Sequence, residues 1–285
     1  MYRFLYLFLV ALLQLTSLHS APLKLSVCSI FHNEDRFLKD WIDFHLAMGV
    51  QRFYLYNHQS SDNFKEVLQP YIDKRQVKLI DWDYSYEDVS QWNDIQCGAY
   101  NDCLKRFGRS SQWIAFIDTD EYVYSPKSVK IPKILKKFKS FAAVSANWVF
   151  YGTSNIYKLD PKIPLIRQLV LRHNDGGDPN HHVKSIVQPS KVIAFRNPHF
   201  AELKPNQLQV TENKESFIGP FSNTLSVKML RINHYWTRDR LFFEEEKMKR
   251  YRSWSKKPDA APFDVSALSQ VRDDAIYKVY KRLKK

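Results

Sequence analysis

Residues 110–126 read "SSQWIAFIDTDEYVYSP", and the chain changes character inside this stretch. Residues 113–117 are apolar and predict a buried strand. Three acids follow at once, Asp118, Asp120 and Glu121. Carboxylates this close repel one another, and their burial costs hydration free energy. A cation between them would compensate both effects. The stretch therefore predicts either a bound metal ion or a neighbouring Lys or Arg at the end of this strand.

Upstream of this stretch, apolar strand patterns alternate with helical patterns. Strands are predicted at 23–31, 51–58, 77–83 and 112–118, and helices at 33–49, 62–75 and 90–108. Such alternation is typical of a parallel sheet covered on both faces. The later part is mixed, with strand-like runs at 141–152 and 225–236, two strand-like pieces around a polar loop within 165–195, and a helix at 237–254. No linker or internal repeat interrupts residues 23–255, so we expect one α/β domain there.

The two ends of the chain read differently from this domain. Within residues 1–20, Arg3 precedes an apolar run at 4–13, and small and polar residues follow. This run is shorter than a membrane span and predicts a signal peptide or a short signal-anchor. The rest of the chain is then expected to be secreted, periplasmic or membrane-associated, in a cell envelope or a Golgi-type lumen. Residues 256–285 are predicted to form a basic, helical C-terminal tail.

The composition narrows the class of protein. The formal net charge of +13 favours anionic partners, and basic patches would suit a membrane surface. Nucleic acid is not expected, because no helix-turn-helix, zinc-finger or RNP-type signature occurs. No G-x-G-x-x-G follows the first strand and no G-x-x-x-x-G-K-[ST] occurs, which argues against a dinucleotide dehydrogenase or a P-loop enzyme. Cys28, Cys97 and Cys103 are predicted to be unpaired thiols.

Polar residues follow each of the four predicted parallel strands, where such sheets bind ligands. They are Asn33, Glu34, Asn57, Asp83, Asp118 and Asp120. The D-x-D pair after the fourth strand offers hard oxygen ligands that suit Mg²⁺ or Mn²⁺, with substrate phosphates completing the coordination. The alternative is an exposed acidic turn, or a pair of acids neutralised by Lys and Arg.

Five segments together resemble glycosyltransferase family 92 and its family-2-like relatives of the GT-A type. They are "IFHNEDRFLKDWIDFHLAMGVQRFYLYNHQSSDN" (30–63), "WIAFIDTDEYVY" (113–124), "NWVFYGTSN" (147–155), "HHVKSIVQPSKV" (181–192) and "RINHYWTR" (231–238). The resemblance rests on their order and spacing over residues 25–245. It implies a Rossmann-like, mostly parallel sheet flanked by helices, with a mixed C-terminal part on the acceptor side.

The resemblance also implies ligands and residue roles. The ligands would be a nucleotide-sugar donor, usually a UDP-sugar, a divalent cation and a glycan or glycoconjugate acceptor. Asp120 and His234 would bind the metal, with Asp118 contacting the metal or the ribose. Seven further residues would contact the donor. Phe31, Asn33 and Glu34 belong to the loop after the first strand, Asp83 would bind the uracil, and Asn147, Trp148 and His182 belong to the later strands. Lys184 would stabilise the departing UDP.

An inverting mechanism, which the resemblance favours, needs a general base for the acceptor hydroxyl. The candidates are Asp175, Asp178, Glu202 and Asp239, of which the first two lie in the loop "NDGGDPN". Each proposed site residue also has a purely structural interpretation, as a helix-capping acid, a core aromatic or a solvated strand residue. A nucleotide-sugar hydrolase and a non-catalytic carbohydrate-binding protein remain the alternatives to a glycosyltransferase.

Overall fold

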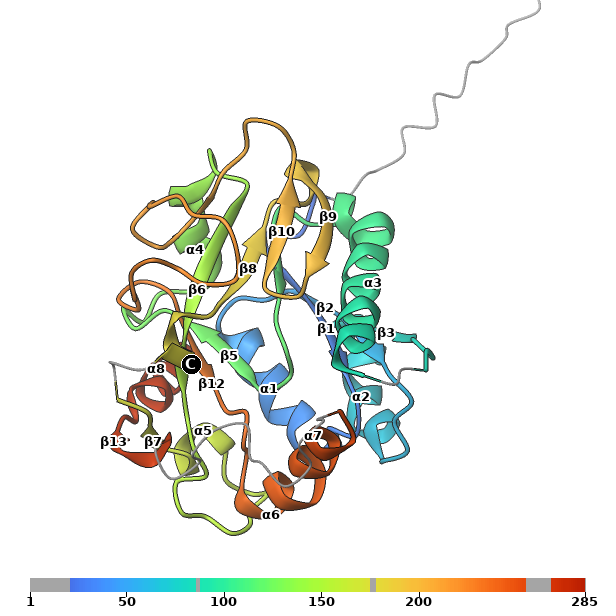
Figure 1. Ribbon diagram of the computed structural model, residues 1–285, viewed down its shortest axis with the longest axis vertical. Helices are drawn as coiled ribbons and strands as arrows, with labels where there is room; N and C mark the ends of the chain where they lie inside the picture. The colour runs from blue at the N-terminus through green and yellow to red at the C-terminus, as the bar shows by residue number, and fades with distance from the viewer. Residues whose placement is uncertain (1–20, 86–87, 175–177, 255–267, 285) are drawn as a thin grey trace, which may run out of the picture.

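The structure is a computed structural model that describes residues 21–85, 88–174, 178–254 and 268–284 (Figure 1). The predicted leader at 1–20 lies outside these residues, so the leader and the localisation inferred from it stay predictions. The described chain is built around one large sheet, whose strands run in the order β3-β2-β1-β4-β8-β6-β12-β5. None of the helices in the described ranges is long and apolar enough to cross a membrane.

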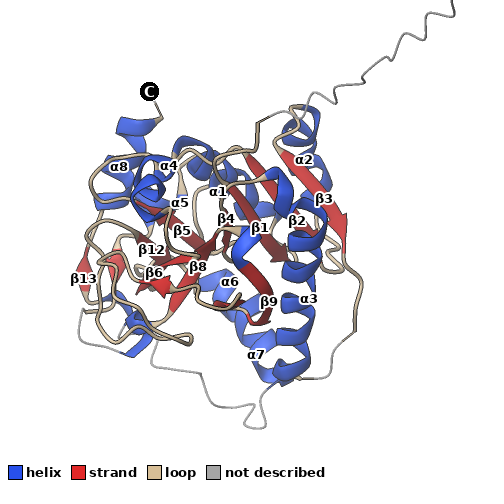
Figure 2. Ribbon diagram, turned by 90° about the horizontal axis from the view of Figure 1, so that it is seen from above, coloured by secondary structure: helices blue, strands red, loops and turns tan. Residues whose placement is uncertain are grey.

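The N-terminal half confirms the predicted alternation of strands and helices. Its elements are β1 (Ser26–Phe31), α1 (Asp35–Ala47), β2 (Arg52–Asn57), α2 (Phe64–Asp73), β3 (Val77–Asp81), α3 (Val89–Phe107) and β4 (Ile114–Phe116). The strands β3, β2, β1 and β4 are all parallel. Alternate residues of β1 pack on opposite faces, Val27 with the core around α1 and Cys28 with the core around α3. Helices therefore cover both faces of the sheet (Figure 2).

The C-terminal half extends the sheet in mixed directions, as predicted. Its strands are β5 (Glu121–Tyr124), β6 (Ala143–Phe150), β7 (Leu171–Arg172), β8 (Val183–Val187), β9 (Val192–Asn197), β10 (Phe200–Leu203), β11 (Gln209–Val210), β12 (Arg231–His234) and β13 (Val271–Arg272). Strand β8 is antiparallel to β4 and β6, β12 is parallel to β6, and β5 is antiparallel to β12. The hairpin β9–β10 and the pair β7–β13 form separate two-stranded sheets.

The remaining helical elements are short. They are α4 (Ile131–Leu135), α5 (Leu165–Gln168), α6 (Arg240–Phe242), a π-helical turn (Phe243–Lys247), α7 (Met248–Trp254), α8 (Ala275–Leu283) and four 3₁₀ turns (Gly108–Ser110, Lys136–Phe138, Asp178–His181, Pro189–Lys191). The helix predicted at 237–254 is thus three consecutive pieces. Strand β5, whose first residue is the third acid of the cluster, was not predicted. The strand predicted at 225–236 is only the four residues of β12.

Helix α8 shows that residues beyond 268 belong to the same body as the sheet. Ile276, Val279 and Tyr280 are buried in the main hydrophobic cluster, while the basic side chains of α8 lie on the exposed face. The described part of the predicted tail therefore packs against the domain. The three cysteines are buried and unpaired, as predicted.

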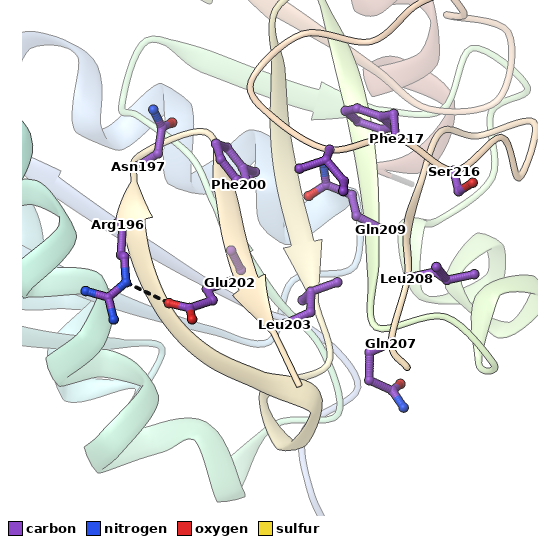
Figure 3. A pocket seen from close by; sticks show the side chains of 12 residues that line it. Arg196, Asn197, Phe200, Glu202, Leu203, Gln207, Leu208, Gln209, Ser216 and Phe217 are labelled. Atoms are coloured by element: carbon purple, nitrogen blue, oxygen red, sulfur yellow. Dashed lines mark hydrogen bonds and ion pairs between the residues drawn. The ribbon is translucent and has the colours of Figure 1, made fainter. Parts of the chain in front are cut away.

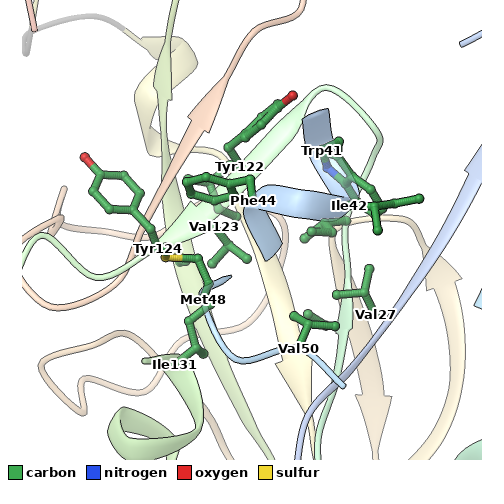
Figure 4. Packing of buried hydrophobic residues seen from close by; sticks show 14 of the residues in the cluster. Val27, Trp41, Ile42, Phe44, Met48, Val50, Tyr122, Val123, Tyr124 and Ile131 are labelled. Carbon is green, nitrogen blue, oxygen red and sulfur yellow. The ribbon is translucent and has the colours of Figure 1, made fainter. Parts of the chain in front are cut away.

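Helix α1 fixes the position of β5, the strand that begins in the acid cluster. Phe44 of α1 and Met48, the residue directly after α1, pack with the aromatic residues of β5 (Figure 4). The indole Nε1 of Trp41 donates to the carbonyl oxygen of Glu121 at 2.8 Å. The ring of His45 donates from Nδ1 to Trp41 O, and its Nε2 accepts from the amide of Val123. The acid cluster is thereby held by a helix whose Trp41 lies 80 residues before Glu121 in the sequence.

His45 makes the stability of this core depend on pH. Burial lowers the pKa of His45 from 6.5 to about 3, so the folded protein keeps the ring neutral. The unfolded chain takes up a proton below pH 6.5, and unfolding free energy is expected to fall by up to about 1.4 kcal/mol per pH unit between pH 6.5 and 3. Urea unfolding of wild type and His45→Met at several pH values measures this slope. An equal slope in both proteins would contradict the assignment to His45.

Candidate active site

A cavity of about 240 Å³ lies at the carboxyl ends of β1 and β4. Its walls come from segments that are far apart in the sequence. Seven of the predicted site residues line it: Phe31, Glu34, Asp118, Asp120, Trp148, Lys184 and His234. The lining also includes residues that were not predicted, among them Gln96, Thr119, His199, Trp236, Lys247 and Arg250. The sheet therefore brings the D-x-D pair, the late histidine and Lys184 together as expected.

Asp118 is paired with a buried lysine. Its Oδ2 lies 3.0 Å from Nζ of Lys184, and its Oδ1 accepts a hydrogen bond from Gln96 at 2.7 Å. Burial disfavours a charge on Lys184, but the carboxylates of Asp118 and Glu121 outweigh this effect and raise its pKa. Lys184 is therefore a fixed cation near the carboxyl end of β4.

Asp120 is paired with a lysine that the sequence reasoning missed. Nζ of Lys247, in the π-helical turn, lies 2.6 Å from Oδ2 of Asp120. Burial opposes a charge on Asp120, yet Lys247, His234 and Arg238 together hold its pKa well below the usual value. Lys247 lies at the head of the basic run "KMKRYR", which suggested a charged surface rather than a buried cation. Both aspartates of the D-x-D pair thus have a lysine partner.

Arg238 ties the loop after β1 to the D-x-D turn. Its guanidinium is fully buried and donates from one nitrogen to Oε2 of Glu34 at 2.8 Å and to the carbonyl oxygen of Thr119 at 2.7 Å. The same group lies 4.5 Å from the centre of the Phe37 ring. Arg238 ends the segment "RINHYWTR", and nothing in the neighbouring sequence marks it as buried.

Glu121, the third acid, faces the interior. Its Oε2 accepts from the amide of Asp118 at 2.9 Å. Burial raises the pKa of Glu121 well above its usual value against the opposing effect of Lys184, and the charges of Asp118 and Asp120 raise it further. Glu121 is thus a structural acid that shapes the D-x-D turn.

The side chains fit a divalent cation in part. Oδ1 of Asp120 is buried without a hydrogen-bond partner among the described residues, and Nε2 of His234 lies 3.3 Å from it. Two neighbouring ligands of one octahedral ion are separated by on the order of 3 Å. Burial lowers the pKa of His234 against the opposing effect of Asp120, which favours the neutral ring that binds metals. Within the described ranges, however, no three His, Cys, Asp or Glu side chains form a ready-made metal site.

Rings surround the inner wall of the cavity. Trp148 lies 4.2 Å from the ring of His234 and stacks on the ring of His182 at 4.7 Å. His182 lies behind Trp148 and does not itself line the cavity. His199, at the turn of the β9–β10 hairpin, completes the cluster at 5.3 Å from Trp148. Trp148 is therefore a wall of the cavity and part of the core at once.

Several predicted residues lie away from the cavity. Asn33 accepts from the amide of Ser61 and Asp83 is exposed beyond β3, and neither lines the cavity. Asn147 is buried, where it donates to Ser222, and Asn57 donates to Asp81. These contacts hold loops in place. The prediction that residues at strand ends face the ligand was therefore too broad.

Two of the four candidate bases, Asp239 and Glu202, lie away from the cavity that contains the D-x-D pair. Asp239 caps α6, and its two oxygens are occupied by the amides of Phe242 and Leu159 and by Arg36. Glu202 is paired with Arg196 on the hairpin. Asp178 begins a 3₁₀ turn, but its side chain and all of Asp175 lie outside the described residues. Neither Asp239 nor Glu202 lines the active-site cavity, and the identity of the base stays a prediction.

Known proteins with similar sequences belong to a family of glycosyltransferases. A family model described as glycosyltransferase family 92 matches residues 21–269. A family 92 protein of Oryza sativa subsp. japonica is 30% identical over 216 residues, 74% of this chain and 33% of that protein. A family 92 protein of Arabidopsis thaliana is 27% identical over 74% of this chain and 35% of that protein.

A galactan beta-1,4-galactosyltransferase of Arabidopsis thaliana is 25% identical over 55% of this chain and 31% of its own length. A solved structure of S. aureus TarS, residues 1–349, matches 90% of this chain and 69% of that one at 11% identity. Its TM-score of 0.38 is too low to transfer any residue role.

The chain spans about a third of the length of the curated relatives it matches. Since the family model covers most of its residues, the chain belongs to glycosyltransferase family 92.

Proposed function

We propose that this chain transfers a sugar from a nucleotide-sugar donor, in the first instance a UDP-sugar, to a glycan or glycoconjugate acceptor. The observation that carries the proposal is the pairing of Asp118 and Asp120 with Lys184 and Lys247 inside one cavity of a family 92 domain. Such a mixture of acids and cations suits a ligand that carries both a diphosphate and a metal ion. The names of the galactosyltransferase relatives support a galactan-like acceptor.

The cations of the cavity would act on the leaving group. Lys184 is buried and fixed by Asp118, so its charge needs no reorganisation when negative charge develops on the departing diphosphate. Lys247 and Arg250 line the same cavity. Both lysines are already paired with the D-x-D acids. An anionic ligand would therefore share each ammonium group with an aspartate, and would not displace water from it.

A divalent cation, Mn²⁺ or Mg²⁺, would be held by Asp120 and His234, with Asp118 at its edge. When bound, it would supply charge neutralisation at the diphosphate. The remaining coordination positions would fall to phosphate oxygens and water, as is common for Mg²⁺. Inversion at the anomeric carbon also requires a base, and the loop that contains Asp175 and Asp178 remains our proposed source.

The proposal predicts cooperative binding of nucleotide and metal. Unfolding temperature would be measured with UDP alone, Mn²⁺ alone and both, each at about 100 times its dissociation constant. A ligand at that excess adds roughly 2.7 kcal/mol, which is several degrees for a domain of this size. We expect the pair to shift the transition more than the sum of the separate shifts. AMP with Mn²⁺ serves as the control, and no shift with UDP under any condition would refute the proposal.

A further inference from the structure

A second cavity has a volume of about 750 Å³, and Figure 3 shows the side chains that line it. It runs between the β9–β10 hairpin and the segment 207–218, and we call it the hairpin groove. Phe200 and Leu203 line it on the hairpin side, and Leu208 and Phe217 line it on the opposite side (Figure 3). Its volume falls within the range of about 300–1,000 Å³ that is typical of ligand sites.

The groove and the active-site cavity share one wall, the turn of the hairpin. Pro198 and His199 line the active-site cavity, while Asn197 and Phe200 on either side of them line the groove. The turn is anchored to β8, because Lys184 donates to the carbonyl oxygen of Pro198 at 3.3 Å and Ser185 donates to that of His199 at 3.0 Å. The two cavities are therefore separated by a single fixed turn.

A row of rings leads outward from the active-site cavity toward the segment 207–218. Trp148 of the active-site cavity stacks on His182, and His182 lies 4.3 Å from the ring of Phe221. Phe221 is 51% exposed and follows Ile218, which lines the groove and is 93% exposed. Ring contacts thus run from the buried Trp148 to the exposed Phe221, three residues after Ile218 of the groove.

The charges of the two cavities differ. The active-site cavity contains Lys184, Lys247 and Arg250, which suit a diphosphate. Among the described residues that line the groove, only Arg196 and Glu202 are charged, and they pair with each other at 2.7 Å. In a chain with a net charge of +13, a groove without net charge favours an uncharged ligand over an acidic one.

We propose that the hairpin groove binds the acceptor, as an extended, neutral oligosaccharide whose reacting end passes the hairpin turn into the active-site cavity. This inference rests on the proposed glycosyl transfer. Apolar side chains of the groove would pack against the C–H faces of the sugars, and the amides of Asn197 and Gln207 would meet their hydroxyls. Longer acceptors would therefore bind more tightly than a disaccharide.

The test measures oligosaccharide and UDP binding separately by calorimetry on the full chain. The probes are β-1,4-linked galacto-oligosaccharides of about two and about six sugars, with oligogalacturonides of matching length as acidic comparators. The variants are Leu208→Ser and Ile218→Ser. The matched control is Ile193→Ser, because Ile193 is exposed to the same 52% as Leu208 but does not line the groove.

We expect both groove variants to bind the longer neutral probe about tenfold more weakly than the wild type does. This loss corresponds to the contact of one aliphatic side chain with the probe. Ile193→Ser and all UDP affinities should match the wild type. Equal affinity in wild type and groove variants would overturn the inference, as would preference for the acidic probe or an equal loss in Ile193→Ser. UDP binding without neutral-probe binding overturns the groove alone, whereas a wild type that binds neither overturns the proposed function as well.

Discussion

Asp120→Asn is expected to reduce sugar transfer by about 10³-fold and to destabilise the fold by about 3 kcal/mol. The carboxylate of Asp120 is the anion nearest to Lys247, whose Nζ lies 2.6 Å away with only 9% of the residue exposed. Removal of one partner of a buried ion pair leaves the other charge uncompensated. Urea unfolding and a donor-turnover assay measure the two effects separately.

A double-mutant cycle separates the structural role of Asp120 from its chemical role. Lys247→Met replaces the ammonium by an apolar group of similar length, so the charge that Asp120→Asn leaves uncompensated is removed as well. Asp120→Asn with Lys247→Met should therefore recover most of the lost stability while transfer stays low. Transfer within tenfold of wild type in Asp120→Asn would show that this carboxylate takes no part in the reaction.

Arg238→Met is expected to lower the free energy of unfolding by about 3–5 kcal/mol. The substitution leaves Glu34 buried without its cation and removes the hydrogen bond to the carbonyl oxygen of Thr119. Since that carbonyl belongs to the D-x-D turn, binding of UDP with Mn²⁺ should weaken as well. Arg238 is a positioning residue, because it acts through Glu34 and Thr119 rather than on the ligand.

Arg240→Met provides the matched control for Arg238. Arg240 lies two residues later and pairs with Glu244 on an exposed surface, where both side chains are largely solvated. Exposed pairs of this kind contribute little to stability. The unfolding midpoint of Arg240→Met should equal that of wild type, and UDP affinity should not change. A similar loss in both variants would refute a specific role for the buried guanidinium.

Local sequence patterns were sufficient for the N-terminal half of the sheet. Strands β1 to β4 are short apolar runs, and α1 and α3 present their apolar residues at helical spacing, so each element can be recognised within its own window. Strand β5 could not be recognised in this way. Its four residues become a strand because they pair with β12, which lies far along the chain.

The sequence by itself determined that three acids lie at the end of a buried strand, and that His234 and Lys184 occur in the segments typical of the family. The tertiary structure alone decided which cation reaches each acid. Lys247 is 127 residues from Asp120, and Arg238 is 204 residues from Glu34. A lysine or arginine has no local mark of its partner, because burial and pairing arise only when distant segments pack together. For Asp118 and Asp120, the protein's own cations at the end of the fourth strand are therefore Lys184 and Lys247.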